Sequence, residues 1–163
     1  MTKYHSTARG VRGKAGGMSP MQIALEEARA AAARGEVPVG AVVTDAAGLV
    51  LSRAGNEVEA RRDPSAHAEM LALRAAAAIT GEKLLREATL WVTLEPCAMC
   101  AQAIAFFRVK RLVFGAYDPK GGGVEHGPRI YTQPTCHHAP EVIGGVRERD
   151  AAALLRQFFA GLR

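Results

Sequence analysis

The chain has 163 residues, of which 48% are hydrophobic and 23% charged, and its formal net charge is +5. This length suits one domain, and this composition excludes a wholly disordered chain. No eighteen apolar residues run together, which excludes a transmembrane helix, and three cysteines favour a reducing compartment, the cytoplasm, over a disulfide framework.

The charge is unevenly spread along the chain. Residues 1–19 carry a net +4, residues 20–107 a net −3, and residues 108–163 a net +4. A polyanionic partner would therefore bind the C-terminal part more readily than the middle. A solvated basic surface accounts for so small an excess equally well, so charge alone does not identify a nucleic-acid-binding protein.

The predicted organisation is one domain preceded by a basic arm. Residues 1–19, rich in glycine, arginine and lysine, predict a disordered N-terminal arm, and residues 20–163 predict a single folded domain. Ser19-Pro20 is typical of a capped helix start, and the apolar stripe that follows predicts a helix ending at Gly35.

Strand and helix patterns alternate after that helix. The further predicted elements are strands 39–44 and 49–52 as a hairpin, a helix from Asp63-Pro64 to Ala78, strand 90–94, a helix from Pro96, strands 112–115 and 142–143, and a terminal helix around 154–159. The alternation predicts an α/β fold, a three-layer α/β/α sandwich with a central mixed sheet of about five strands. Residues 117–140 are too long for a plain connector and predict a functional loop.

Two short fragments, each at the start of a predicted helix, suggest a metal site. Cys97 and Cys100 are three residues apart on one helix face, so both sulfurs can reach one ion, and His67 offers a nitrogen from another helix. Three protein ligands leave open the fourth position that a catalytic Zn²⁺ needs to activate water. Glu69 would carry protons there, although regular helical spacing points residues two apart in different directions.

A closed structural zinc site is the alternative. Cys136, His137 or His138 would then supply the fourth ligand, or these three residues would form a second metal site. Polar loop residues and an unreactive thiol explain the same stretch more simply. The open site is favoured because a structural site gains nothing from an unligated Glu69.

Several segments resemble the bacterial tRNA adenosine deaminase family, and the order His-x-Glu before Pro-Cys-x-x-Cys is the signature of zinc nucleobase deaminases. The similarity covers about residues 21–122 and returns in the last helix. It rests on Gly35–Ala41, Asn56, Asp63–Glu69, Thr93–Cys100 and Val113–Gly122. The resemblance implies a cytidine-deaminase-like fold, one Zn²⁺ per chain, no organic cofactor, and a homodimer that converts wobble adenosine (position 34) to inosine in the tRNA anticodon arm.

The resemblance assigns roles at the metal site. His67, Cys97 and Cys100 match the zinc ligands of the family, and Glu69 matches its proton shuttle. Glu69 would take a proton from the attacking water and return protons to ring N1 and to the departing amine of adenine.

Substrate contacts are also implied by the resemblance. Asn56 and the Ala68 backbone match positions that hold the flipped base, Asp118 matches a contact to the neighbouring nucleotides, and Phe159 matches a contact of the last helix with the anticodon loop. A turn-stabilising Asn56 and a loop-capping Asp118 are the structural alternatives.

Two stretches depart from the family pattern. Ala105–Arg108 is bulkier and more apolar, and Val124–His138 replaces a Gly-Ser-Leu stretch. Because these changes could reshape the substrate mouth, a zinc-dependent deaminase of a free nucleobase or nucleoside, of the guanine or cytosine type, remains an alternative. A non-catalytic, zinc-stabilised binding module is the second alternative, against which Glu69 argues.

Overall fold

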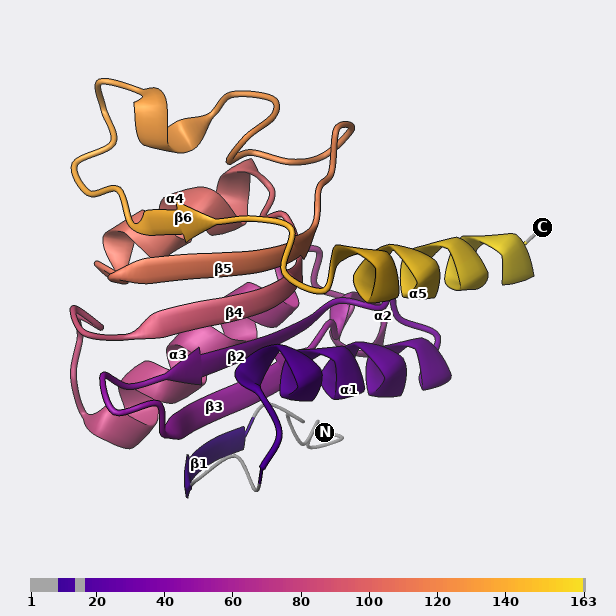
Figure 1. Ribbon diagram of the computed structural model, residues 1–163, viewed down its shortest axis with the longest axis horizontal. Helices are drawn as coiled ribbons and strands as arrows, with labels where there is room; N and C mark the ends of the chain where they lie inside the picture. Colours follow the sequence, from indigo (N-terminus) through magenta and orange to yellow (C-terminus); the bar gives the residue numbers. More distant parts are fainter. Residues whose placement is uncertain (1–8, 14–16, 163) are drawn as a thin grey trace.

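The computed structural model describes residues 9–13 and 17–162, and only the backbone of 9–13 (Figure 1). A six-stranded sheet of order β1-β3-β2-β4-β5-β6 forms its centre. The strands are β1 (Arg9–Gly13), β2 (Gly40–Thr44), β3 (Val50–Gly55), β4 (Thr89–Leu94), β5 (Arg111–Ala116) and β6 (Glu141–Ile143). From β1 to β4 the neighbours pair antiparallel, whereas β4, β5 and β6 are parallel. The mixed sheet is confirmed.

Helices cover both faces of this sheet. They are α1 (Pro20–Ala33), α2 (Val58–Arg61), α3 (Ala68–Thr80), α4 (Ala98–Phe106) and α5 (Glu148–Gly161). α1 and α5 share one face, with Met21 and Val113 in its core, and α3 and α4 cover the other, around Leu73, Ile104 and Phe114 (Figure 1). The three-layer α/β/α architecture is therefore confirmed. No helix in the described ranges has both the length and the apolar character needed to cross a membrane.

Part of the N-terminal arm belongs to the sheet. β1 pairs antiparallel with β3 and is the strand beyond the five that the sequence predicted. The expected disorder is therefore wrong for residues 9–13, since an open sheet edge offers backbone hydrogen bonds to a segment of any composition. The rest of the expected arm before Gly17, residues 1–8 and 14–16, lies outside the described residues.

Local chemistry determines both ends of α1, as predicted. Ser19 and Gln22 form a capping box. The backbone N–H of Gln22 donates to Ser19 Oγ (3.2 Å), and the backbone N–H of Ser19 donates to Gln22 Oε1 (2.8 Å). Pro20 occupies the first helical position. After the C-cap, Gly35 has a φ of +83°, a left-handed conformation that glycine adopts without strain.

α1 lies unusually close to β2. A Cβ atom at Gly40 would stand only 1.9 Å from Ala24 O and 2.7 Å from Ala28 N, so only glycine fits there. The small apolar residues of α1 permit this approach. Because α1 packs so closely on β2, the connection between them lies at the edge of the pocket described below.

α3 and α4 begin later than predicted. Asp63 Oδ1 accepts hydrogen bonds from Ser65 N (2.8 Å) and Ser65 Oγ (2.7 Å), which makes a turn where the sequence predicted a first helical turn. The short α2 before it has no predicted counterpart. Each of the two helices begins directly after an extended N-cap residue, His67 or Cys97, whose side chain makes no capping hydrogen bond. Both side chains are therefore available for contacts outside their helices.

Residues 117–140 form the long connection that the sequence predicted. Its regular structure is a single 3₁₀ turn, η1 (Ile130–Thr132), in the described chain. The Tyr131 hydroxyl donates to Ala101 O of α4 at 3.0 Å, which fixes the connection beside the metal-site helix.

Candidate metal centre

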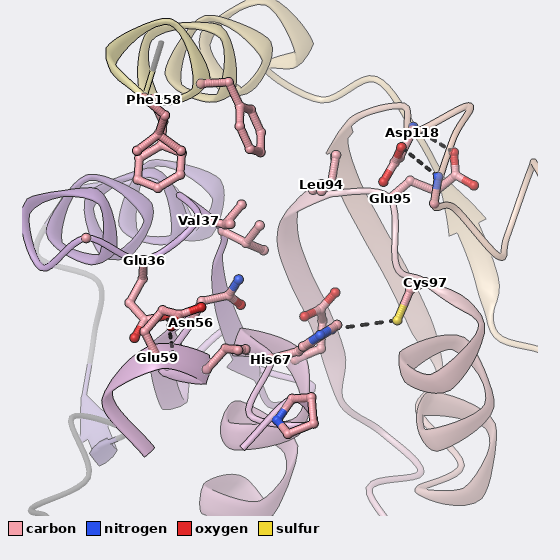
Figure 2. A pocket seen from close by; sticks show the side chains of 18 residues that line it. Glu36, Val37, Asn56, Glu59, His67, Leu94, Glu95, Cys97, Asp118 and Phe158 are labelled. Atoms are coloured by element: carbon pink, nitrogen blue, oxygen red, sulfur yellow. Dashed lines mark hydrogen bonds between the residues drawn. The ribbon is translucent and has the colours of Figure 1, made fainter. Parts of the chain in front are cut away.

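The N-termini of α3 and α4 bring three ligand side chains together. His67 Nδ1 lies 3.6 Å from Cys97 Sγ (Figure 2). It lies 3.5 Å from Cys100 Sγ, and the three atoms are within 4.8 Å of one another. The extended N-cap conformation of His67 explains why regular helical spacing does not apply to this residue. The predicted grouping of these three residues is confirmed.

The geometry of this cluster suits Zn²⁺. Zinc bonds of about 2.0–2.1 Å to nitrogen and 2.3 Å to sulfur, at tetrahedral angles, separate the two ligand atoms by about 3.5 Å. The observed separations are 3.5 and 3.6 Å. Among the described residues no further His, Cys, Asp or Glu joins the three. A zinc ion here would therefore have three protein ligands and an open fourth position.

The Cys136 loop does not complete this site. Cys136 Sγ donates to His138 O at 3.2 Å, and His138 Nε2 bonds Val109 O at 2.7 Å. Within the described ranges these residues belong to no possible metal cluster. Among the described residues the geometry therefore favours the open zinc site, with His67, Cys97 and Cys100 as its three protein ligands.

The thiols of Cys97 and Cys100 have very different pKa values in the metal-free site. The hydrogen bond from Cys100, assisted by His67, lowers the pKa of Cys97 to about 4 despite partial burial. The same pairing with Cys97, together with burial, raises the pKa of Cys100. One thiolate is therefore already present in the metal-free site, where it attracts a cation.

Glu69 is a buried carboxyl beside the cluster. Its side chain lines the pocket, and its Oε2 has no hydrogen-bond partner in the structure. Burial raises its pKa to about 7, although the nearby His67 opposes this shift. A carboxyl with such a pKa can both accept and release a proton near neutral pH, as a proton shuttle requires.

The cluster lies in an open pocket of about 520 Å³. Its walls are the α1–β2 connection, α2, the starts of α3 and α4, the loop after β5 and the last turns of α5 (Figure 2). In Figure 2 His67 faces Cys97, and Phe158 of α5 lies across the pocket. Elements from both faces of the sheet thus meet at one end of it.

Asn56 lies inside this pocket and is tied to α3. It is only 8% exposed, and its Oδ1 accepts the Ala68 amide at 2.8 Å. This contact fixes the side-chain amide and leaves its Nδ2 to face the pocket (Figure 2). The backbone N–H of Ala68 already has a partner in the protein, so Ala68 orients Asn56.

Asp118, in the loop after β5, and Phe159, in α5, line the same pocket. Asp118 Oδ1 caps its own loop by accepting the amides of Lys120 (3.2 Å) and Gly121 (2.9 Å). The Phe159 ring is 49% exposed and meets Phe158 edge to face at 5.4 Å. The loop-capping role of Asp118 is therefore observed, and it coexists with a position at the pocket.

Two buried carboxylates were missed by the sequence analysis. Glu36 accepts the amides of Glu59 (3.1 Å) and Ala60 (2.8 Å) and so positions α2. Glu95 is buried directly after β4; burial opposes its ionisation, but hydrogen bonds from His126 and from backbone amides outweigh burial and lower its pKa. The available signal was an acidic residue between an apolar strand and the Pro-Cys motif.

Comparison with known proteins agrees with this geometry. Residues 18–116 match the cytidine and deoxycytidylate deaminase zinc-binding region. Fold and site together therefore define a zinc-dependent deaminase, a class of hydrolase. The zinc cofactor that the sequence predicted agrees with this class. Among curated proteins, the tRNA-specific adenosine deaminase of Agrobacterium fabrum is 54% identical over 140 residues, 85% of this chain and 91% of that protein. The Bacillus subtilis enzyme of the same name is 43% identical, over 88% of each chain.

Solved structures lead to the same family. A structure from a study of A-to-I editing by tRNA:A34 deaminases superposes with a TM-score of 0.82 at 51% identity, covering 83% of this chain and 98% of that one. Guanine deaminase from Nitrosomonas europaea superposes with a TM-score of 0.76 at 26% identity, covering 94% and 88%. This chain belongs to the tRNA-specific adenosine deaminase family.

Proposed function

We propose that this enzyme hydrolyses the wobble adenosine of tRNA, position 34 of the anticodon, to inosine and ammonia. The observation that carries the proposal is the buried Glu69 carboxyl, whose Oε2 has no hydrogen-bond partner, beside a three-ligand metal cluster in an open pocket. A binding module would gain nothing from such an acid, because an unpartnered buried carboxyl costs stability.

Each side chain of the centre has a separate task in this reaction. His67, Cys97 and Cys100 hold the ion. Zinc, when bound, supplies the positive charge that activates water for attack at C6. Glu69 accepts a proton from that water and delivers it to ring N1, and it then takes the proton of the hydroxyl group added at C6 and delivers it to the leaving amine, which departs as ammonia. Its elevated pKa suits both halves of this transfer.

The base is held by Asn56 in this proposal. The Ala68 amide fixes Oδ1, and the Nδ2 donor faces the substrate. An acceptor on the substrate, such as a purine ring nitrogen, would pair with this donor.

The anticodon arm is the substrate that suits the pocket mouth. The mouth is open and carries two aromatic rings, the half-buried Phe158 and the exposed Phe159, on which unpaired bases can stack. Asp118 lies opposite them, in reach of the neighbouring nucleotides. Residues 108–163, with their net +4, would attract the phosphates. A tRNA substrate also implies a cytoplasmic enzyme.

A homodimer is part of the proposal. α4 carries the exposed apolar side chains Met99 (39%) and Phe106 (69%), seven residues apart and so on one side of the helix. The same helix contains Cys100 and is preceded by its N-cap residue Cys97, two of the three metal-site residues. A second copy seated on this side would therefore lie close to the metal centre.

Incubation with unmodified tRNA that carries adenosine at position 34 tests the function. We expect inosine at that position by nucleoside analysis, about one Zn²⁺ per chain, and no turnover by Glu69→Ala with its zinc retained. A panel of free bases and nucleosides, including guanine and cytosine, runs in parallel. Turnover of a free base with none on tRNA would instead support the small-molecule alternative.

A further inference from the structure

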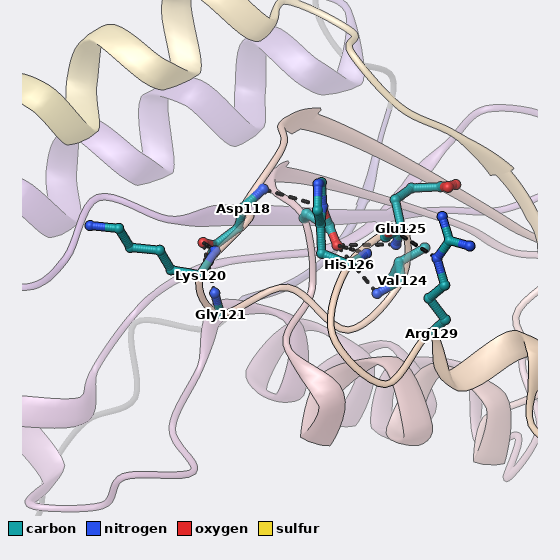
Figure 3. Close-up of polar contacts among 8 residues, drawn as sticks. Asp118, Lys120, Gly121, Val124, Glu125, His126 and Arg129 are labelled. Carbon is teal, nitrogen blue, oxygen red and sulfur yellow. Dashed lines mark hydrogen bonds and ion pairs between the residues drawn. The ribbon is translucent and has the colours of Figure 1, made fainter.

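The loop after β5 wraps around one buried carboxylate (Figure 3). Glu95 has a fully buried side chain and follows the last residue of β4. Its Oε1 accepts the Asp118 amide (3.1 Å) and bonds His126 Nδ1 (2.8 Å). Its Oε2 accepts three successive amides, of Val124 (3.3 Å), Glu125 (3.1 Å) and His126 (3.2 Å). Both ends of the loop 118–126 are thus tied to a single residue.

This loop also lies directly on the segment that carries the metal ligands. The Gly123 amide donates to Pro96 O at 2.8 Å. A Cβ at Gly123 would stand 2.5 Å from Ala98 N, and a Cβ at Gly122 would stand 2.2 Å from Glu95 Oε2. The backbone therefore approaches Glu95 and the start of α4 more closely than any residue with a side chain allows.

The same loop forms a wall of the pocket. Asp118 and Gly121 line it, and the Asp118 amide is one of the groups that Glu95 holds. The hydrogen bonds that tie this loop to the rest of the site end on Glu95 and on the backbone of Pro96, and not on the side chains of the reacting groups, so the wall can shift while those side chains stay in place.

We infer that Glu95 is a positioning residue that sets the substrate-facing wall of the pocket by holding the loop 118–126, and that His126 is the side chain that locks this arrangement. The inference rests on the proposed function for the identity of the substrate. His126 lies in the long connection between β5 and β6, near its start. Its ring is 34% exposed, which makes it replaceable without opening the core.

His126→Ala and His126→Asn separate the hydrogen bond from the ring. Asparagine keeps a donor near the position of Nδ1, whereas it loses the edge contact that the ring makes with Tyr117 at 6.2 Å. We expect His126→Ala to raise KM for tRNA about tenfold, the value of a hydrogen bond to a charged group, with kcat and zinc content unchanged. His126→Asn should restore most of the wild-type KM. His137→Ala, an exposed histidine of the same connection, is the matched control.

Hydrogen exchange of the amides in 118–126 provides a second readout that needs no substrate. We expect faster exchange in His126→Ala and wild-type exchange in His126→Asn. Unchanged exchange together with unchanged KM in His126→Ala would overturn the inference, and so would a fall in kcat or zinc content in place of a KM effect. If wild-type protein failed to deaminate tRNA, the proposed function would fail, and the exchange data would still decide whether His126 locks the loop.

Discussion

Burial changes the chemistry of individual residues at this site. Glu69 is shut away from water without a partner for Oε2, whereas Glu95, equally buried, is surrounded by amides and His126. The first carboxyl has a raised pKa and the second a lowered one, because hydrogen bonds to the ionised form offset desolvation only in the second. One is thereby suited to moving protons, and the other to holding a loop.

The raised pKa of Glu69 predicts a pH-dependent stability of the metal-free protein. The folded state binds this proton up to about pH 7, whereas the unfolded chain releases it near 4.5. The contribution of Glu69 to stability should therefore fall as pH rises from about 4.5 to 7, whereas the lowered pKa of Cys97 acts in the opposite direction in wild type and variant alike. Glu69→Gln lacks this loss, so its stability relative to wild type should grow by about 3 kcal/mol across that window. Urea unfolding of the wild type and of Glu69→Gln at pH 4.5, 6 and 8 measures the two free energies of unfolding. A difference between the two proteins that stayed constant with pH would contradict the prediction.

At the scale of elements, the beginnings of the helices matter more than their lengths. α3 and α4 both start with an extended residue that uses its side chain for the metal site and not for capping. Two helix N-termini therefore point at the same place, where their dipoles favour thiolates. Another wall of the pocket consists of the α1–β2 connection and α2. The close packing of α1 on β2 and the hydrogen bonds from α2 to Glu36 hold these two segments in place.

Gly40→Ala should weaken the contact between α1 and β2. The new methyl group would overlap Ala24 O, a backbone atom that moves only with the helix. We expect a loss of at least about 2 kcal/mol in the free energy of unfolding, measured by urea denaturation. Gly161→Ala, whose Cβ would meet nothing within 4 Å, is the control and should be neutral. Equal stability of the two variants would argue against the tight packing.

At the scale of the whole molecule, the pocket exists because the three layers meet at one end of the sheet. α5 contributes aromatic rings from one face, and α3 and α4 contribute the metal ligands from the other. The zinc ligands therefore lie among groups from distant parts of the chain. The domain boundary at residue 20 stays a prediction, since β1 adds residues 9–13 to the sheet while its neighbours lie outside the described chain.

The proposed dimer is testable at this scale. Phe106→Glu places a charge on the most exposed large apolar side chain among those described, so we expect it to convert a wild-type dimer into a monomer. Light scattering coupled to gel filtration measures the mass. Ile143→Glu, a 40% exposed position on β6, should leave the dimer intact. A Phe106→Glu protein that kept the dimeric mass would locate the interface elsewhere.

Much of the fold and the metal site could be predicted from the sequence. Apolar periodicity, the Ser19-Pro20 start and the turn residues depend on neighbours in the chain, and these predicted α1 and the strands β2 to β6. Residue chemistry predicted that His67, Cys97 and Cys100 form one cluster. The roles of Asn56 and Glu69 in the reaction remain predictions.

Only the tertiary structure decided which backbone groups meet the buried acids. Glu95 collects its partners 23 to 31 residues along the chain, because parallel pairing of β4 and β5 places their ends side by side. β1 likewise depends on the open edge of β3 and not on its own composition. Local sequence specifies a helix or strand through the conformations that each residue prefers, whereas contacts between distant segments depend on topology, which local preferences do not encode.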